Sequence, residues 1–218
     1  MTPTKDRLDR ETVVTRAIAL ADAEGIDALT IRRLAADFHV TPMALYWHFK
    51  NKDELFDGIA EQLFRTVVLP DASGTWADRL RACLSAVTSA LRPHPAIASL
   101  TQSRLLASES GLVVAERALG LLDEAGFTSD QAAEIGGYLV NAIVTLITAE
   151  PGRDRGAEAV RHQRAMLGAL SPDRFPHVIA AADALSACAD DDAYYARGIG
   201  LLITGAQGLV ETGPLDVR

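Results

Sequence analysis

Apolar residues recur along this chain at the three- and four-residue spacing that places them on one face of a helix. The first such stripe runs through residues 10–24 and ends at Gly25, a residue that favours helix ends. Thr30 is predicted to cap a second helix, whose apolar positions end at Phe38. The front of the chain is therefore predicted to be helical almost from its beginning.

A third helix is predicted to run from its cap Thr41 to about Phe49. Asn51 stands three residues before Glu54, which is the spacing of a capping box, and it predicts a fourth helix that reaches about Val67. Two short helices joined by a tight turn form a helix-turn-helix pattern, which many helical bundles also contain. The side chains of the third helix therefore have to show whether this pattern indicates DNA binding or ordinary helix packing.

The rest of the chain is a series of helical segments separated by breaks that contain proline or glycine. These segments cover residues 75–91, 96–107, 112–125, 129–149, 157–170, 178–187 and 193–212. No alternating strand pattern and no repeat stands out. The sequence predicts an all-α protein with a helix-turn-helix domain at residues 1–52, a connecting helix at 53–69 and a larger effector-binding and dimerisation domain at 70–218.

Charge is divided unequally between these parts. The chain of 218 residues is 49% hydrophobic, enough to bury a core, and carries a net charge of −8. Residues 1–52 hold 8 basic and 7 acidic residues, whereas residues 53–218 hold 13 and 22. Because the acidity lies in the larger part, the first part can approach the phosphates of a nucleic acid.

Neither a signal peptide nor a membrane span is expected from the sequence. Its N-terminus is polar with charges of both signs, and no run of about 18 apolar residues occurs. A cytoplasmic protein without a membrane partner is expected. Cys83 and Cys188 are far apart and have no metal-ligand spacing, so both are expected to be structural thiols. We predict no metal site and no cofactor.

The third helix carries the strongest indication of function. At 100° per residue, Leu45 and Phe49 share its buried side, whereas Met43 and Trp47 point the opposite way, with Tyr46 flanking them. Exposed aromatic and thioether groups are unfavourable on a surface that contacts only water. They suit the major groove of DNA, where apolar groups can meet thymine methyls. The alternative is that this face packs against the larger domain.

Two basic residues complete the predicted surface. Arg32 lies off the apolar stripe of the second helix and could reach a guanine edge. Lys52 lies in the first turn of the fourth helix, where free N–H groups and the helix dipole favour a phosphate. For each, the alternative is an ordinary solvated side chain.

These residues match a known family. The segments Thr30-Ile31-Arg32-Arg33-Leu34-Ala35 and Val40 to Leu55 resemble the DNA-binding domain of regulators of the tetracycline-repressor (TetR) type, and Tyr46 to Lys52 looks like the tetracycline repressors themselves. The resemblance is specific over residues 10–60 and looser beyond. It implies a homodimer that reads double-stranded operator DNA with a palindromic sequence and is released by a small-molecule inducer. By position it assigns operator contacts to Arg32, Thr41, Pro42, Met43, Ala44, Tyr46, Trp47 and His48, and a phosphate contact to Lys52.

The chain departs from that branch in three places. Its recognition helix begins Pro42-Met43-Ala44 where the tetracycline branch has Gln-Pro-Thr, so a different operator is expected. His39 stands where the turn usually has glycine, and a positive φ there would cost about 1 kcal/mol. The residues that grip tetracycline in that branch align with Val68 and Cys83, so binding of tetracycline with magnesium is not expected.

The larger domain is expected to hold the effector and the dimer contacts. Gln102, Tyr138 and Asn141 are polar groups on otherwise apolar segments and are candidates to line an effector pocket, although core or surface roles are the alternative. Residues 193–212 contain four glycines, which in a helix favour close approach of another helix. The resemblance implies that this segment and residues 129–149 of two subunits form the dimer core. The candidate interface residues are Gly198, Leu202, Gly205 and Leu209, with internal packing as the alternative.

Repression has two alternatives. A TetR-type activator or co-regulator would have the same sequence features, because direction depends on where the operator lies. A helical enzyme would need a catalytic constellation, and the chain has no GxSxG motif, no phosphate-binding loop and no His-x-x-x-His pair. The sequence therefore favours a ligand-responsive repressor that is not an enzyme.

Overall fold

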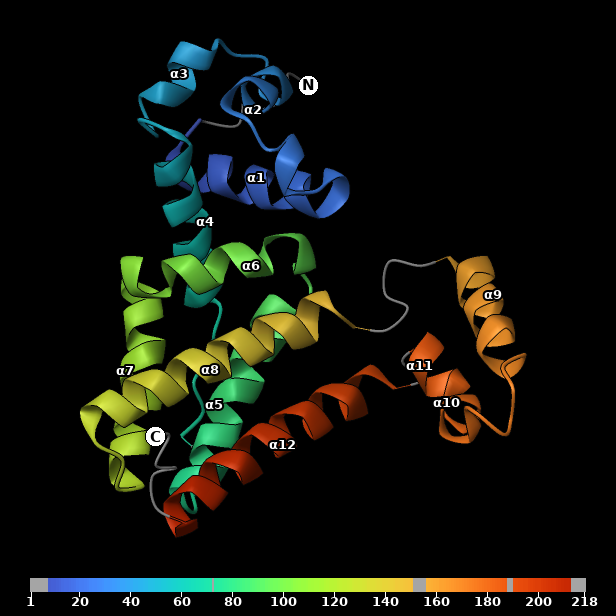
Figure 1. Ribbon diagram of the computed structural model, residues 1–218. Coiled ribbons are helices and arrows are strands. Elements are labelled where there is room, and N and C mark those ends of the chain that lie inside the picture. The colour runs from blue at the N-terminus through green and yellow to red at the C-terminus, as the bar shows by residue number, and fades with distance from the viewer. Residues whose placement is uncertain (1–7, 72, 151–155, 188–189, 213–218) are drawn as a thin grey trace.

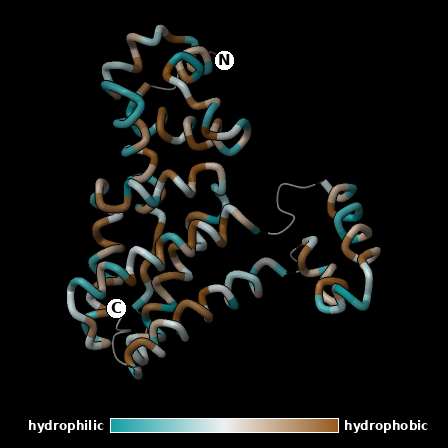
Figure 2. The backbone as a smooth tube through the Cα atoms, viewed as in Figure 1, coloured by the Kyte–Doolittle hydropathy of each residue, from teal (hydrophilic) through white to brown (hydrophobic). Residues whose placement is uncertain are grey.

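The computed structural model describes residues 8–71, 73–150, 156–187 and 190–212. All regular secondary structure in these ranges is helical (Figure 1), so the predicted all-α class is confirmed. Hydrophobic and hydrophilic positions alternate along the helices (Figure 2), which is the amphipathic pattern that mutual packing requires.

The N-terminal part, here called the head, consists of four helices and a short 3₁₀ turn. They are α1 (Arg10–Glu24), η1 (Ile26–Ala28), α2 (Ile31–Asp37), α3 (Pro42–Tyr46) and α4 (Lys52–Arg65). Gly25 ends α1 with φ +85°, and its N–H donates to the carbonyl of Ala21 at 2.8 Å. The Thr30 hydroxyl accepts the Arg33 N–H at 3.1 Å and caps α2. Both boundaries lie where the sequence predicts them.

The turn between α2 and α3 is a Schellman motif with histidine in the position that usually holds glycine. The N–H of Val40 donates to the carbonyl of Ala35 at 3.0 Å, and the N–H of His39 donates to that of Ala36 at 3.1 Å. This pairing requires a left-handed residue, and His39 has φ +54°. His39 therefore takes a left-handed conformation that glycine would adopt without strain.

Helix α3 is shorter than predicted. It ends at Tyr46, and the chain then turns through Trp47 while the Phe49 N–H still donates to the Leu45 carbonyl at 3.0 Å. Pro42 occupies the first turn as predicted, but the Thr41 side chain makes no capping hydrogen bond. The early end frees the backbone to bring Phe49 into the core before α4 begins.

Asn51 starts α4 with a modified capping box. Its side chain accepts the N–H of Glu54 at 2.8 Å, as the spacing predicts. The Glu54 carboxylate accepts the N–H of Lys50 at 2.8 Å instead of that of Asn51. The cap therefore ties the end of the α3 turn to the start of α4.

The larger part, here called the body, contains the remaining helices. They are α5 (Trp76–Leu91), α6 (Pro95–Arg104), η2 (Leu105–Ala107), α7 (Glu109–Glu124), α8 (Ser129–Thr148), α9 (Ala157–Gly168), α10 (Pro176–Ala180), α11 (Ala182–Ser186) and α12 (Asp191–Thr212). The single helix predicted at residues 178–187 is wrong, because Ala181 with φ −96° and ψ +4° divides it into α10 and α11.

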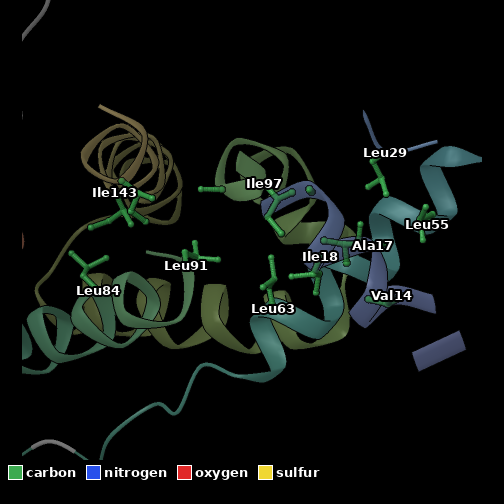
Figure 3. Close-up of a cluster of buried hydrophobic side chains, with 14 of the residues drawn as sticks. Val14, Ala17, Ile18, Leu29, Leu55, Leu63, Leu84, Leu91, Ile97 and Ile143 are labelled. Carbon is green, nitrogen blue, oxygen red and sulfur yellow. The ribbon is translucent and has the colours of Figure 1, made fainter. Parts of the chain in front are cut away.

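The head and the body share one apolar core. Helix α6 lies directly below α1, and α4 descends alongside α7 and α6 (Figure 1). Val14 and Ile18 of α1 belong to the same buried cluster as Leu91 of α5 and Ile97 of α6 (Figure 3). The predicted divisions after residues 52 and 69 fall at the start of α4 and in the segment that follows it. A displacement of α6 would therefore be felt directly by α1 and α4.

Candidate DNA-binding face and effector cavity

The outward side of α3 and the turn after it forms an apolar face, defined here as Met43, Tyr46 and Trp47. Their exposed fractions are 67%, 47% and 85%, whereas Leu45 and Phe49 are completely buried. The split between the two sides is the one that helical spacing predicts. In the described structure the larger domain does not cover this face, so the alternative of internal packing is wrong for Met43 and Trp47.

The apolar face is held in place from behind by Arg10 of α1. The Arg10 guanidinium lies 4.6 Å from the centre of the Phe49 ring and donates to the carbonyl of His48 at 3.0 Å. It also donates to the Glu54 carboxylate at 3.1 Å. One side chain thus joins α1, the turn after α3 and the start of α4, so the face is preorganised for binding.

Most arginines of the head are occupied by carboxylates. Arg33 is paired with Glu24 and Asp37, and its pKa is raised first by the hydrogen bond to Glu24 and then by the charge of Asp37. Arg16 also binds Asp37, at 2.8 Å. Arg32 is exposed and forms no ion pair with any described residue. It is therefore the arginine of α2 that can reach outward.

The other predicted operator contacts surround the apolar face. Lys52 is exposed in the first turn of α4, and its ammonium lies 5.0 Å from the centre of the Phe56 ring. Thr41 and Pro42 are exposed, while Ala44 and His48 are half-buried. The nine predicted DNA-binding residues thus lie on α2, at the cap of α3, on α3 itself, on the turn after it and in the first turn of α4.

A cavity of about 600 Å³ lies in the body among α4, α5, α6, α7, α8 and η2, a size that is typical of small-molecule pockets. Gln102 of α6 and Asn141 of α8 line it, and the Gln102 amide donates a hydrogen bond to the Asn141 side-chain oxygen. Both predicted residues are therefore placed at one cavity.

Tyr138 does not line this cavity, contrary to the prediction. Its ring is 62% exposed, and its hydroxyl donates to the carboxylate of Glu134 at 2.7 Å. The physical reason is helical phase, since Gly137 and Asn141 face the cavity and Tyr138 lies beyond them around α8.

Cys83 lies on the cavity wall and is 2% exposed. Burial raises the pKa of its thiol to about 11, and the charge of Arg117 opposes this shift only in part. Val68, which aligns with the other tetracycline-gripping position, is 81% exposed and does not line the cavity. Cys188 lies outside the described residues. Within the described ranges, no three His, Cys, Asp or Glu residues are grouped as a metal site would require.

Helix α12 packs partly against its own chain. A β-carbon on Gly198 would lie 2.7 Å from a methyl group of Leu146, so this glycine allows α12 to approach α8 of the same subunit. Leu202 and Leu209 are half-buried against the internal core. Gly205 is exposed with open space around its α-carbon. Of the four predicted interface residues, Gly205 alone is turned fully outward.

Sequence reasoning missed Leu201 and Arg104. Leu201 is 76% exposed on α12, on the side that carries Gly205. Arg104 ends α6 directly after the cavity-lining Ser103, and its guanidinium donates to the carboxylates of Asp53 at 2.8 Å and of Asp57 on α4. The neighbouring sequence does not indicate either residue, because the position of each depends on where a distant helix packs.

A helix-turn-helix head that presents an uncovered apolar face, joined through a shared core to a body with a cavity of ligand size, defines a DNA-binding regulator that responds to a small molecule. No helix among the described residues is long and apolar enough to cross a membrane.

Comparison with known proteins gives the family. Residues 13–59 match the model of bacterial regulatory proteins of the tetR family, and residues 69–210 match that of the tetracyclin repressor-like C-terminal domain. The chain belongs to the TetR family, and it is a ligand-responsive, DNA-binding transcriptional repressor. Regulators of this family bind operator DNA and act as dimers.

Individual relatives agree with this assignment. The chain is 31% identical over 148 residues to an HTH-type transcriptional regulator of Saccharopolyspora erythraea, an alignment that covers 67% of this chain and 63% of that protein. It is 28% identical to the tetracycline repressor protein class C of Escherichia coli, over 97% of both chains. The structure of ActR of Streptomyces coelicolor in complex with actinorhodin superposes with a TM-score of 0.78 at 25% identity, covering 94% of this chain and 99% of ActR.

Proposed function

We propose that this repressor binds a palindromic operator as a homodimer through α3, and that a small molecule in the body cavity releases it. The observation that carries the proposal is the 85% exposure of Trp47 on a face that is braced from behind and left uncovered. A rigid aromatic group in such a position supplies contact area at low entropic cost.

The residues of the apolar face and those around it would make different kinds of contact with the operator. Met43, Ala44 and Trp47 would meet thymine methyls in the major groove, and Arg32 would reach a guanine edge. Thr41, Pro42, Tyr46 and His48 would line the groove walls, and Lys52 would neutralise a phosphate. The apolar contacts would then set much of the sequence preference.

The dimer would use the outward sides of α8 and α12. Leu201 and Gly205 lie four residues apart on one exposed side of α12, and Tyr138 is exposed on the side of α8 that faces away from the cavity. Gly198 is already used for contact within the subunit. We therefore propose that the interface lies on the side of α12 that carries Leu201 and Gly205, and not on the side where Gly198 contacts its own subunit.

The structural change that releases the operator would be transmitted from the cavity to α4 through Arg104. Ser103 and Leu105, its neighbours in the chain, line the cavity, while the Arg104 guanidinium is bound to α4 carboxylates. A ligand that shifts this end of α6 would move α4, and with it the turn that Arg10 ties to α4. Two heads that change their spacing would no longer match both half-sites.

A mobility-shift titration on palindromic DNA from the region upstream of the gene tests the proposal. Trp47→Ala is expected to weaken operator binding by roughly a hundredfold or more, because each of two heads loses an aromatic anchor worth about 2 kcal/mol. Val68→Ala removes an equally exposed apolar group that lies away from α3 and should leave the affinity unchanged. Full operator affinity in the Trp47 variant would exclude α3 as the reading element.

A further inference from the structure

The cavity carries no charged side chain. Among the described residues that line it there is no Asp, Glu, Lys, Arg or His. Apolar groups from five helices, among them Phe64, Leu84 and Ile143, form most of its wall. A charged ligand group placed there would lose its hydration without gaining a counter-ion, which is strongly unfavourable.

The hydroxyl groups of the wall are largely occupied. Thr101 donates to the carbonyl of Ala98 at 2.6 Å, and Ser103 donates to that of Leu100 at 3.1 Å. Ser99 is exposed to solvent. These groups are partly satisfied by backbone or water, so none of them demands a partner from the ligand.

The amide pair Gln102–Asn141 is the remaining polar feature. Both side chains are exposed, which places the pair at the mouth of the cavity, between α6 and α8. After their mutual hydrogen bond, the Gln102 oxygen can still accept and the Asn141 amide can still donate. A neutral hydroxyl or carbonyl group on a ligand matches this donor–acceptor set without carrying a charge.

Small residues line one strip of the cavity on α7 and α8. Ala115 and Ala118 lie on α7, and Ala133, Gly136 and Gly137 lie on α8. A β-carbon on Gly137 would meet nothing within 4 Å, so the space in front of it is open. The strip that these five residues form has few projecting side chains, and it suits the flat face of a ring system better than a branched chain.

The charges nearest the cavity do not alter this conclusion. The Arg104 guanidinium is bound by Asp53 and Asp57. Arg117 acts on Cys83, yet burial outweighs it and the pKa of the thiol is raised. The wall therefore disfavours an ionised group at Cys83, even though the charge of Arg117 acts there.

From these observations we infer that the effector is an uncharged molecule with a flat, largely apolar ring body and a hydroxyl or carbonyl group that binds the Gln102–Asn141 pair. The inference rests on the proposed function, since it takes the cavity to be the effector site. It excludes effectors that would bury a carboxylate or an ammonium group against the apolar wall.

A matched set of fluorescent probes tests this ligand class on the full-length protein. Pyrenemethanol, pyrenecarboxylate and pyrenemethylammonium share one flat body and differ in charge. Pyrenemethanol is expected to bind at least about tenfold more tightly than either charged probe. Triphenylmethanol, a neutral alcohol of similar size that is not flat, is expected to displace it poorly. Equal or tighter binding of a charged probe or of triphenylmethanol, or no binding of pyrenemethanol, overturns the inference.

Two glycine variants locate the binding. Gly137→Phe fills the open space at the cavity and is expected to reduce pyrenemethanol binding by at least about tenfold. Gly120→Phe places the same side chain on an exposed position of α7 that does not line the cavity, and should leave binding unchanged. Both variants should retain the operator affinity of the parent protein, which shows that they fold. Equal probe binding in the two variants overturns the assignment of the ligand to this cavity.

The operator shift separates this inference from the proposed function. Release of operator DNA by pyrenemethanol but not by pyrenecarboxylate supports both. Tight binding of pyrenemethanol without release contradicts induction through the cavity while supporting the ligand class. Release by a charged probe with little effect of the neutral one supports induction and overturns the ligand class.

Discussion

The apolar face of α3 and the body cavity are both apolar surfaces that the chain itself does not fill, but they are built in opposite ways. The face is convex and comes from five consecutive positions, Met43 to Trp47. The cavity is concave and collects side chains from residues 64 to 144. The first is a local property of a short helix, whereas the second exists only after five helices have packed.

This difference affects how each surface tolerates change. The face depends on a few buried groups directly behind it, above all Leu45 and Phe49. The cavity has many wall residues, each of which contributes little. A single substitution should therefore have a large effect on the face in the head and a small effect on the cavity in the body.

The largest expected effect tests the support of the face. Leu45→Ala removes a completely buried side chain and should lower the free energy of unfolding by about 2–5 kcal/mol in urea denaturation. Met43→Ala, two positions away and 67% exposed, should change it by no more than about 0.5 kcal/mol. Similar losses in both variants would contradict the assignment of the two sides of α3.

The next effect tests the connection between the two surfaces. Arg104→Ala should lower the free energy of unfolding by about 1–3 kcal/mol, because a half-buried guanidinium loses hydrogen bonds to Asp53 and Asp57. Arg65→Ala breaks the exposed pair with Glu11 and should cost about 0–1 kcal/mol. The Arg104 variant should also need more ligand for operator release. An Arg104 variant as stable as the Arg65 variant would remove the link between cavity and head.

The smallest effect depends on pH and concerns the start of α4. The pKa of Glu54 is lowered from its ordinary value of 4.5, first by the Lys50 N–H and then by Arg10. The ionised form is therefore favoured in the folded state, so its contribution to stability is present above the ordinary pKa and is lost as pH falls through the lowered one. Glu54→Gln should thus lower the melting temperature at about pH 6 and make little difference at about pH 3. A constant difference at both values would show that the carboxylate charge has no role in the cap.

Much of the head could be predicted because its determinants are local. The caps at Thr30 and Asn51, the stop at Gly25 and the left-handed His39 each follow from neighbouring residues. The end of α3 was wrong, because the helical spacing continues to Phe49 while the backbone leaves the helix at Tyr46. Periodicity alone does not show where tertiary packing interrupts a helix.

The body was harder to predict from the sequence. The apolar residues that line the cavity have the same spacing as core residues, since both lie on inward helix faces. Gln102 and Asn141 could be identified as polar interruptions, but Tyr138 looked the same in the sequence and faces outward. Likewise Gly198 and Gly205 are equivalent in the sequence, and only the position of Leu146 distinguishes them.

The central claim is that the apolar face of α3 is the surface that meets DNA. In a Trp76→Phe variant, Trp47 is the sole tryptophan, and acrylamide quenching of its fluorescence reports its exposure. Quenching should be strong in the free protein, fall to that of a buried tryptophan when operator DNA is bound, and recover when ligand releases the operator. Unchanged quenching of Trp47 in a complex that a mobility shift shows to be saturated with operator would contradict the claim.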